Sequence, residues 1–396
     1  MFDWLMPAPT PRKFADALMR FAVRSGFSEP IHFDEENFRF LTGVKRDATI
    51  NLENMFREFR AAPRRDRDRL LARYATLLSS PALPASFAQA RPDLLPVIRS
   101  RSWAEHVRLA GIVNDETNTT PWVPFGSDAV IMIALDRPES MSMLTASHFS
   151  DWNIDFDTAL QAARDNLRDA SAGQFEQLPG GVWSSTWSDS YDSSRILFAD
   201  IVHRTGLADP VAMIPTRDRL LVASGGDPAA QLAMLACAAA AFEEEGRPVS
   251  ASMFHFRDGK AQVFEPLDAQ VGLQAGNFAR YYRAEDYAAQ KRMLDEINEK
   301  RGIDLFVATY ALLEYEGRAD LVSECTWSEG VETLLPETDR VALVRFDEAG
   351  QPHSLGAVDW AQLQRVAGHL MTPRPDEFPI RYHVTQFPDI SQLNFS

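Results

Sequence analysis

Several features that would assign this chain to a familiar protein class are scarce or missing. Only two of the 396 residues are cysteine. Neither Cys237 nor Cys325 lies in a CxxC pair or beside a histidine, so the spacing predicts no zinc site and suits a reducing compartment. The longest apolar run, residues 232 to 242, is about half as long as a bilayer-spanning helix. The first residues contain no basic leader followed by an apolar core, so we expect a cytoplasmic protein with no membrane partner.

Positive charge is also in short supply. The chain has 40 lysines and arginines against 56 acidic residues, which gives a formal net charge of −16. Proteins that bind nucleic acid use lysine and arginine to displace the counterions of the phosphate backbone. The balance therefore predicts no nucleic-acid partner. The densest basic run, residues 64 to 73, alternates its arginines with Asp66 and Asp68, as on a solvated helix face.

The sequence motifs of common enzymes are absent. There is no G-x-S-x-G elbow, no phosphate-binding loop of the G-x-x-x-x-G-K-[ST] type and no H-E-x-x-H. The eight histidines are scattered without the spacing of metal ligands. The sequence therefore predicts no cofactor and no metal centre, and it leaves open whether the chain is an enzyme.

What the chain does contain is a mixture of helical and strand-like segments. Apolar residues recur at helical spacing over residues 11–24, 227–245 and 287–302. Short apolar runs separated by turn residues predict hairpins at 31–34 with 38–41, 210–215 with 219–224, and 252–256 with 261–266. No regular βαβ period connects them. We therefore predict an α+β fold of mixed helices and mostly antiparallel short sheets, in two to three subdomains.

Composition along the chain suggests where these subdomains meet. The proline-rich stretch 79–86 is typical of a linker. A new run of helix and strands starts near residue 276. We predict a helix and hairpin unit at 1–85, an α+β domain at 86–272 and a second α+β domain at 273–396.

Three motifs occur in order in the middle domain: DLLPVIRS at 93–100, DSYDSSR at 189–195 and VAMIPTRDRLLV at 211–222. Together they resemble the YtpQ-like bacterial family, a domain of unknown function with the signatures P-V-I/L-R, G-Y-D-x-S-R and V-P-x-R-D-x-L. Ser190 stands where that family usually has glycine. The resemblance spans residues 90 to 250. It implies kinship and a bacterial cytoplasmic context, and it implies no particular chemistry.

The second motif is the candidate site, and it has two interpretations. In the structural one, Asp192 caps the first turn of a buried helix by accepting hydrogen bonds from free backbone amides. In the functional one, those amides hold a phosphate or carboxylate together with serine hydroxyls and arginine side chains. Asp189 and Asp192 could also bind a Mg²⁺ ion that carries a phosphate ligand. Each of the three motifs contributes an arginine. The candidate ligand-binding residues are Arg99, Asp189, Asp192, Ser193, Ser194, Arg195 and Arg217.

Two functions are compatible with these residues. The absence of a catalytic constellation and the many aromatic residues favour a noncatalytic protein that binds a protein partner or itself. The alternative is an enzyme or binder of a small phosphorylated or carboxylated ligand at the second motif. Its arginines could equally form internal ion pairs.

Overall fold

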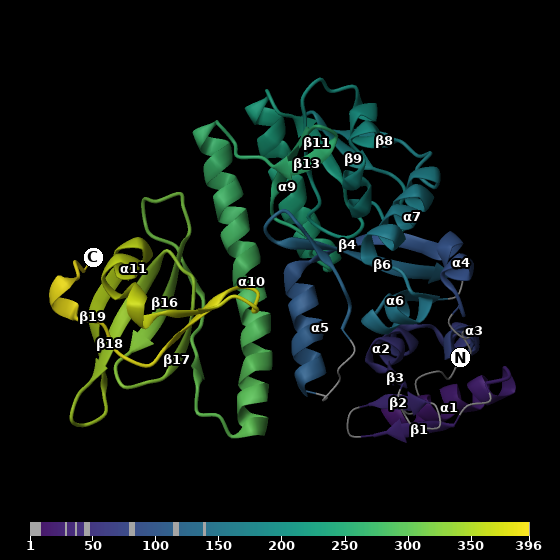
Figure 1. Cartoon of the computed structure of the whole chain (residues 1–396), viewed down its shortest axis with the longest axis horizontal. Coiled ribbons are helices and arrows are strands. Elements are labelled where there is room, and N and C mark those ends of the chain that lie inside the picture. The colour runs from purple at the N-terminus through teal and green to yellow at the C-terminus, as the bar shows by residue number, and fades with distance from the viewer. Residues whose placement is uncertain are drawn as a thin grey trace, which may run out of the picture. The chain divides into compact units, whose positions relative to one another are not determined.

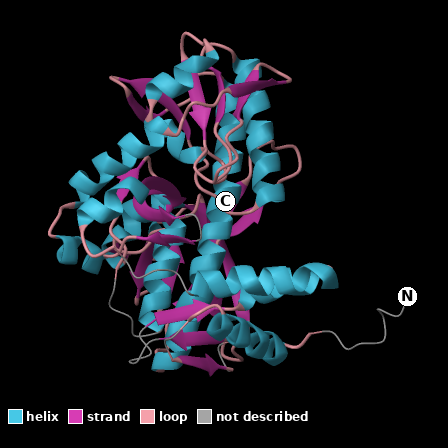
Figure 2. Ribbon diagram, turned by 90° about the vertical axis from the view of Figure 1, so that its right-hand side faces the viewer, coloured by secondary structure: helices cyan, strands magenta, loops and turns pink. Residues whose placement is uncertain are grey.

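The computed structural model describes residues 9–27, 30–35, 38–42, 48–78, 84–113, 119–137 and 140–395. The structure contains both helices and strands (Figure 2), and its small sheets are mostly antiparallel, which confirms the predicted α+β class. Within the described residues, no helix combines the length and apolar character that a membrane crossing requires. The chain divides into two compact units, Met1–Ala85 with Asp136–Ser142 and Ser86–Leu135 with Met143–Ser396.

The smaller unit packs three helices around a small antiparallel sheet. Thr10 caps the first helix by accepting a hydrogen bond from the backbone N–H of Lys13, and Pro11 occupies the first turn. Phe14, Phe40 and Tyr74 bring helix and sheet into one core. The predicted helix and hairpin are confirmed, while residues 79–83 of the predicted linker lie outside the described residues. The elements are α1 (Pro11–Arg24), β1 (Ile31–Asp34), β2 (Arg39–Thr42), β3 (Ala48–Asn51), α2 (Glu53–Ala61) and α3 (Arg64–Leu78).

The larger unit begins with two antiparallel sheets. One has the order β4-β6-β5, and the other has six strands in the order β13-β12-β10-β11-β9-β8. Their strands are β4 (Leu94–Ser100), β5 (Val123–Phe125), β6 (Ala129–Arg137), β8 (Phe175–Leu178), β9 (Val182–Ser185), β10 (Pro210–Met213), β11 (Leu221–Ser224), β12 (Met253–Arg257) and β13 (Lys260–Val263). The helices of this part are α4 (Phe87–Ala90), α5 (Arg101–Val113), α6 (Ala146–Trp152), α7 (Phe156–Asp169), α8 (Ala199–Val202) and α9 (Pro228–Glu245). The strand β7 (Ser140–Met143) falls mostly within Asp136–Ser142, which belongs to the smaller unit.

Both faces of the six-stranded sheet are buried. Val211 and Met213 of β10 belong to a core that includes Met234 of α9. Ala212 and Ile214 belong to a second core on the opposite face. Successive strand residues point to opposite faces, so a strand covered on both sides has an apolar run without alternation. This burial explains the continuous apolar motif VAMI at 211–214.

The largest difference from the predicted elements is α10 (Ala269–Arg301), which contains 33 residues and is about 50 Å long. Asp268 caps it, and Gly302 ends it in a left-handed conformation. The sequence predicted only the second half, because glycines and alanines interrupt the apolar pattern of the first half. The predicted boundary between 272 and 273 lies inside this helix, and the three-domain division remains a prediction.

Two four-stranded sheets follow α10. One has the order β14-β17-β21-β20, and the other has the order β15-β16-β18-β19. Trp327, Leu343 and Leu363 form their shared core. The elements are β14 (Phe306–Val307), β15 (Ala311–Leu313), β16 (Val322–Ser328), β17 (Thr333–Pro336), β18 (Arg340–Phe346), β19 (Pro352–Asp359), α11 (Trp360–Ala367), β20 (Thr372–Arg374) and β21 (Arg381–Val384).

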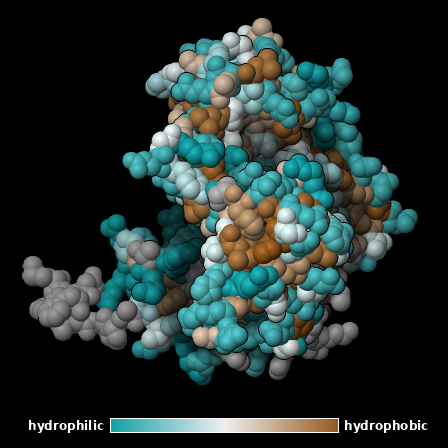
Figure 3. Space-filling model, turned by 90° about the vertical axis from the view of Figure 1, so that its left-hand side faces the viewer, coloured by the Kyte–Doolittle hydropathy of each residue, from teal (hydrophilic) through white to brown (hydrophobic). Residues whose placement is uncertain are grey.

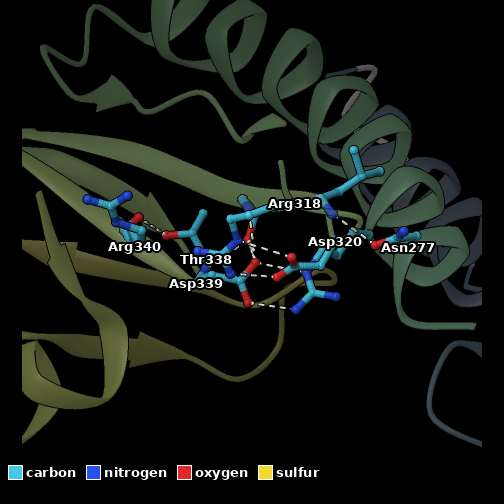
Figure 4. A network of polar contacts seen from close by, with 9 residues as sticks. Asn277, Arg318, Asp320, Thr338, Asp339 and Arg340 are labelled. Atoms are coloured by element: carbon cyan, nitrogen blue, oxygen red, sulfur yellow. Dashed lines mark hydrogen bonds and ion pairs between the residues drawn. The ribbon is translucent and has the colours of Figure 1, made fainter. Parts of the chain in front are cut away.

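Helix α10 connects these sheets to the rest of the larger unit, since it packs along α5 on one side and contacts β14 and β15 on another (Figure 1). Asp339 is central to this connection (Figure 4). It accepts two hydrogen bonds from Arg280 of α10, at 2.8 and 3.0 Å, and two more from Ser323. Burial alone would raise the pKa of Asp339, but these hydrogen bonds outweigh it and lower the pKa to about 2. The carboxylate therefore stays charged and holds helix and sheet together.

Candidate functional site

The second motif does not start a regular α-helix. Residues 193–197 form a 3₁₀ helix, η2 (Ser193–Leu197), which leads to the short α8. Asp192 already has helical backbone angles, and its side chain makes no capping hydrogen bond to the first turn of η2. The predicted helix cap is therefore wrong. In a 3₁₀ helix, the N–H of residue i+3 donates to the carbonyl of residue i. The N–H groups of Ser194 and Arg195 donate in this way to the carbonyls of Tyr191 and Asp192.

Asp192 instead closes the loop that precedes η2. Its carboxylate accepts hydrogen bonds from the backbone N–H groups of Ser188 and Asp189, at 3.3 and 3.4 Å. Burial raises the pKa of Asp192, and a hydrogen bond from the Ser185 hydroxyl acts against that rise. In the same loop Ser190 has a φ of +70°. Glycine adopts this left-handed conformation without steric cost, which gives a physical reason for glycine at this position.

Asp189 and Arg195 form an internal ion pair. Arg195 is fully buried and donates to both Asp189 oxygens, at 2.8 and 2.6 Å. Its Nε donates to Ser171 Oγ, and its guanidinium carbon lies 4.3 Å from the centre of the Trp187 ring. Every face of this guanidinium is occupied by the protein itself. The guanidinium is therefore not free to hold a ligand, while the Asp189 side chain is 40% exposed and has both oxygens engaged by Arg195.

A different group of arginines gathers beside this loop. Arg99 is the penultimate residue of β4, Arg217 lies in the turn between β10 and β11, and Arg247 follows α9. Two backbone hydrogen bonds and one hydrogen bond from backbone to side chain bring these segments together. The Ser193 N–H donates to the Arg217 carbonyl at 3.2 Å, and the Arg217 N–H donates to the Arg247 carbonyl at 3.3 Å. Ser194 Oγ accepts a hydrogen bond from the Ile98 N–H at 3.1 Å. We call Arg99, Arg217 and Arg247 the arginine cluster.

The electrostatics of the arginine cluster show that its charges repel. Burial, together with the charge of Arg217, lowers the pKa of Arg99 to about 10. Burial and the charge of Arg247 likewise lower the pKa of Arg217. Asp218 and Tyr191 act in the opposite direction on both side chains. Among the described residues, no carboxylate lies within ion-pair distance of any of the three guanidiniums.

Two donors near the cluster have no protein partner. Arg99 is 7% exposed, and its Nη1 donates to the Ile98 carbonyl at 2.8 Å while its Nη2 has no hydrogen-bond partner. The hydroxyl of fully buried Ser193 has none either. Most buried polar atoms are hydrogen-bonded. An anion beside the Arg99 Nη2 would satisfy that donor and offset the repulsion among the arginines.

The predicted site residues thus separate into two groups. Arg99, Ser193 and Arg217 lie together at the arginine cluster. The others serve the fold through the contacts described above; they are Asp189, Asp192, Ser194 and Arg195. Sequence reasoning missed Arg247, which approaches Arg217 because an isolated β-bridge pairs Thr216 with Pro248. No local sequence signal announces that bridge.

The described residues contain no group of three or more histidine, cysteine, aspartate or glutamate side chains placed to hold a metal ion. Both oxygens of Asp189 accept hydrogen bonds from Arg195, so the pairing with Mg²⁺ considered from the sequence would have to displace that guanidinium. The cluster therefore presents guanidinium donors rather than metal ligands. Comparison with known proteins gives no relative: no family model, curated protein or solved structure matches the chain.

Proposed function

We propose that the chain is a binder of phosphorylated or carboxylated molecules and that the arginine cluster is its binding site. The observation that supports this most strongly is the unpartnered Nη2 of Arg99, in a side chain only 7% exposed and beside the like charge of Arg217. Two neighbouring guanidiniums without an anion are each destabilised by burial and by the charge of the other.

The geometry of guanidinium groups favours a phosphate among the two ligand classes. Guanidinium presents a planar fork of donors that matches the oxygens of phosphate or carboxylate. A phosphate carries more charge and more acceptor oxygens than a carboxylate, and three arginines with the Ser193 hydroxyl offer donors to several of them. A phosphorylated small molecule is therefore the preferred ligand.

Binding without catalysis is the simplest role for this site. A serine nucleophile needs a neighbouring base within hydrogen-bond reach. The Ser193 hydroxyl has no hydrogen-bond partner at all. We therefore assign Ser193 a contact with the ligand rather than a reaction with it.

Protein binding is the second candidate function, and exposed apolar side chains favour it. Leu267 is fully exposed and Val263 is 44% exposed. On the face shown in Figure 3, apolar side chains gather in patches between hydrophilic ones. A partner that docks through Leu267 would not depend on Arg217, so the two candidate functions are tested by different variants.

We further propose kinship with the YtpQ-like bacterial family and a cytoplasmic location. The three ordered motifs support the kinship, and the left-handed Ser190 suits the glycine of the family signature. The two cysteines are unpaired, as is usual in a reducing compartment.

Inorganic phosphate and pyrophosphate are suitable probes of the anion site. A ligand that binds only the folded state raises the melting temperature, so wild-type protein should melt at higher temperature as phosphate is added. Arg217→Gln should weaken phosphate binding at least about tenfold, since a charge-assisted hydrogen bond is lost. Without phosphate, the same variant should melt at or above the wild-type temperature, because it relieves repulsion within the cluster.

Arg257→Gln provides a matched control, because Arg257 is an exposed arginine at the end of β12 and outside the cluster. It should keep the full response to phosphate. The proposal would be refuted if phosphate stabilised the wild type no more than chloride of equal ionic strength, or if Arg217→Gln responded like the wild type.

A further inference from the structure

A cavity of about 420 Å³ lies in the larger unit, away from the arginine cluster. Helix α10 supplies one wall, residues 251–253 and 263–266 supply another, and residues 378–380 supply a third. Pockets for small organic ligands start at about 300 Å³, whereas one water occupies about 30 Å³. The cavity is therefore large enough for an organic molecule and far larger than a bare ion requires.

Two carboxylates line this cavity. Asp286 of α10 is only 9% exposed, and burial raises its pKa to about 7. Asp128, just before β6, accepts hydrogen bonds from Ser250 Oγ at 2.7 Å and from the Ala251 N–H at 2.9 Å. Burial raises the pKa of Asp128 as well. Neither carboxylate forms an ion pair with another described residue, although a buried carboxylate normally has a cationic partner.

A buried hydroxyl without a hydrogen-bond partner also lines the cavity. Tyr282 lines the cavity, is 2% exposed, and its hydroxyl makes no hydrogen bond. Burial first, and then the charges of Asp286 and Asp128, raise the pKa of Tyr282 well above its usual value. The hydroxyl therefore lies within electrostatic reach of both acids. The wall of the cavity thus carries two carboxylates and one hydroxyl, whose oxygen can accept a hydrogen bond as well as donate one.

We propose that this cavity binds a small molecule that carries a primary ammonium group on an apolar body. A primary ammonium has three N–H donors and one positive charge, and it would meet the oxygens of Asp286, Asp128 and Tyr282. The remaining wall is largely apolar and includes Met253 and Phe378. This site is independent of the anion site and has the opposite charge preference.

The charge around the opening agrees with a cationic ligand. Two further acids line the cavity, Glu265 and Glu337, against a single basic side chain, Arg283. A metal ion is a poorer occupant, because the described residues include no cluster of three or more side chains that could ligate one. The excess of acid would attract a cation before it enters.

Calorimetry on the full chain with 2-phenylethylamine, and with 2-phenylethanol as its neutral counterpart, tests the proposal. Wild-type protein should bind the amine at least about tenfold more tightly than the alcohol, as expected for a charge-assisted hydrogen bond. Asp286→Asn should bind the two alike. Ala275→Leu, which fills part of the α10 wall, should weaken both.

Glu285→Gln is the matched control, since Glu285 is an exposed acid on the same helix outside the cavity. It should retain the wild-type preference for the amine. The proposal is overturned if wild-type protein binds the amine more weakly than about 1 mM, if it fails to discriminate amine from alcohol, or if Asp286→Asn keeps that discrimination. None of these outcomes bears on phosphate binding at the arginine cluster.

Discussion

Arg195→Ala is expected to destabilise the larger unit by about 4 kcal/mol. The substitution removes a fully buried guanidinium together with its two hydrogen bonds to Asp189, its hydrogen bond to Ser171 and its contact with the Trp187 ring. It also leaves a cavity that the surrounding side chains fill only in part. The midpoint of thermal unfolding should fall by on the order of 10 °C.

An exposed ion pair in the same part of the chain provides the comparison. Arg168 pairs with Asp200 at 2.8 Å, but its side chain is 49% exposed. Arg168→Ala should therefore cost less than about 1 kcal/mol. If Arg195→Ala destabilised the protein no more than Arg168→Ala does, the buried ion pair of Arg195 would not be what stabilises the second motif. Because unfolding would abolish any ligand response, Arg195 is unsuitable for testing the anion site, whereas the half-buried Arg217 is suitable.

Arg381→Ala is expected to have an equally large effect on the C-terminal sheets. Arg381 of β21 is fully buried, and burial lowers its pKa to about 10. Its guanidinium donates to Gln290 Oε1 at 2.7 Å and to the carbonyls of Ala308, Leu334 and Tyr287 at 2.9 to 3.3 Å. Alanine would remove these four hydrogen bonds to a charged group, each of which contributes about 1.5 to 3 kcal/mol before relaxation. A loss of at least about 4 kcal/mol should result.

Urea denaturation followed by tryptophan fluorescence would measure this loss, since Trp327 belongs to the C-terminal core. Arg318 is the matched control in the same region, because it pairs with Asp320 at the surface and its side chain is 54% exposed. Arg318→Ala should shift the urea midpoint only slightly. Equal shifts for the two variants would show that Arg381 does not hold α10 and the sheets together.

Local chemistry explains what the sequence predicted well. Asp227 was expected to cap the helix that begins at Pro228, and its carboxylate accepts hydrogen bonds from the N–H groups of Ala229 and Ala230. The hairpin around Thr216 was expected from two apolar runs and a polar turn, and the register pairs Met213 with Leu221. These features depend on residues close in sequence, so pattern and turn chemistry are sufficient to predict them.

Contacts between distant segments explain what the sequence did not predict. Arg247 reaches Arg217 through a bridge between segments that are separated by the whole of α9. Asp286 and Asp128 line one cavity although they lie on α10 and next to β6. The misassigned cap at Asp192 has a different, local cause, because its carboxylate accepts hydrogen bonds from the N–H groups of Ser188 and Asp189 in the preceding loop instead of from the first turn of η2. Local sequence indicates which structures and hydrogen-bond partners a residue favours, and tertiary packing decides which of them it adopts.

The central claim is that Arg99 and Arg217 share an anion, and a crystal grown with sodium tungstate tests it most directly. Tungstate is an oxyanion with a strong anomalous signal, so its position is measured independently of the protein model. The account predicts an anomalous peak within hydrogen-bonding distance of the Arg99 and Arg217 guanidiniums, close to the Ser193 hydroxyl. The absence of a peak there, with the Asp218 carboxylate bound to both arginines instead, would contradict it.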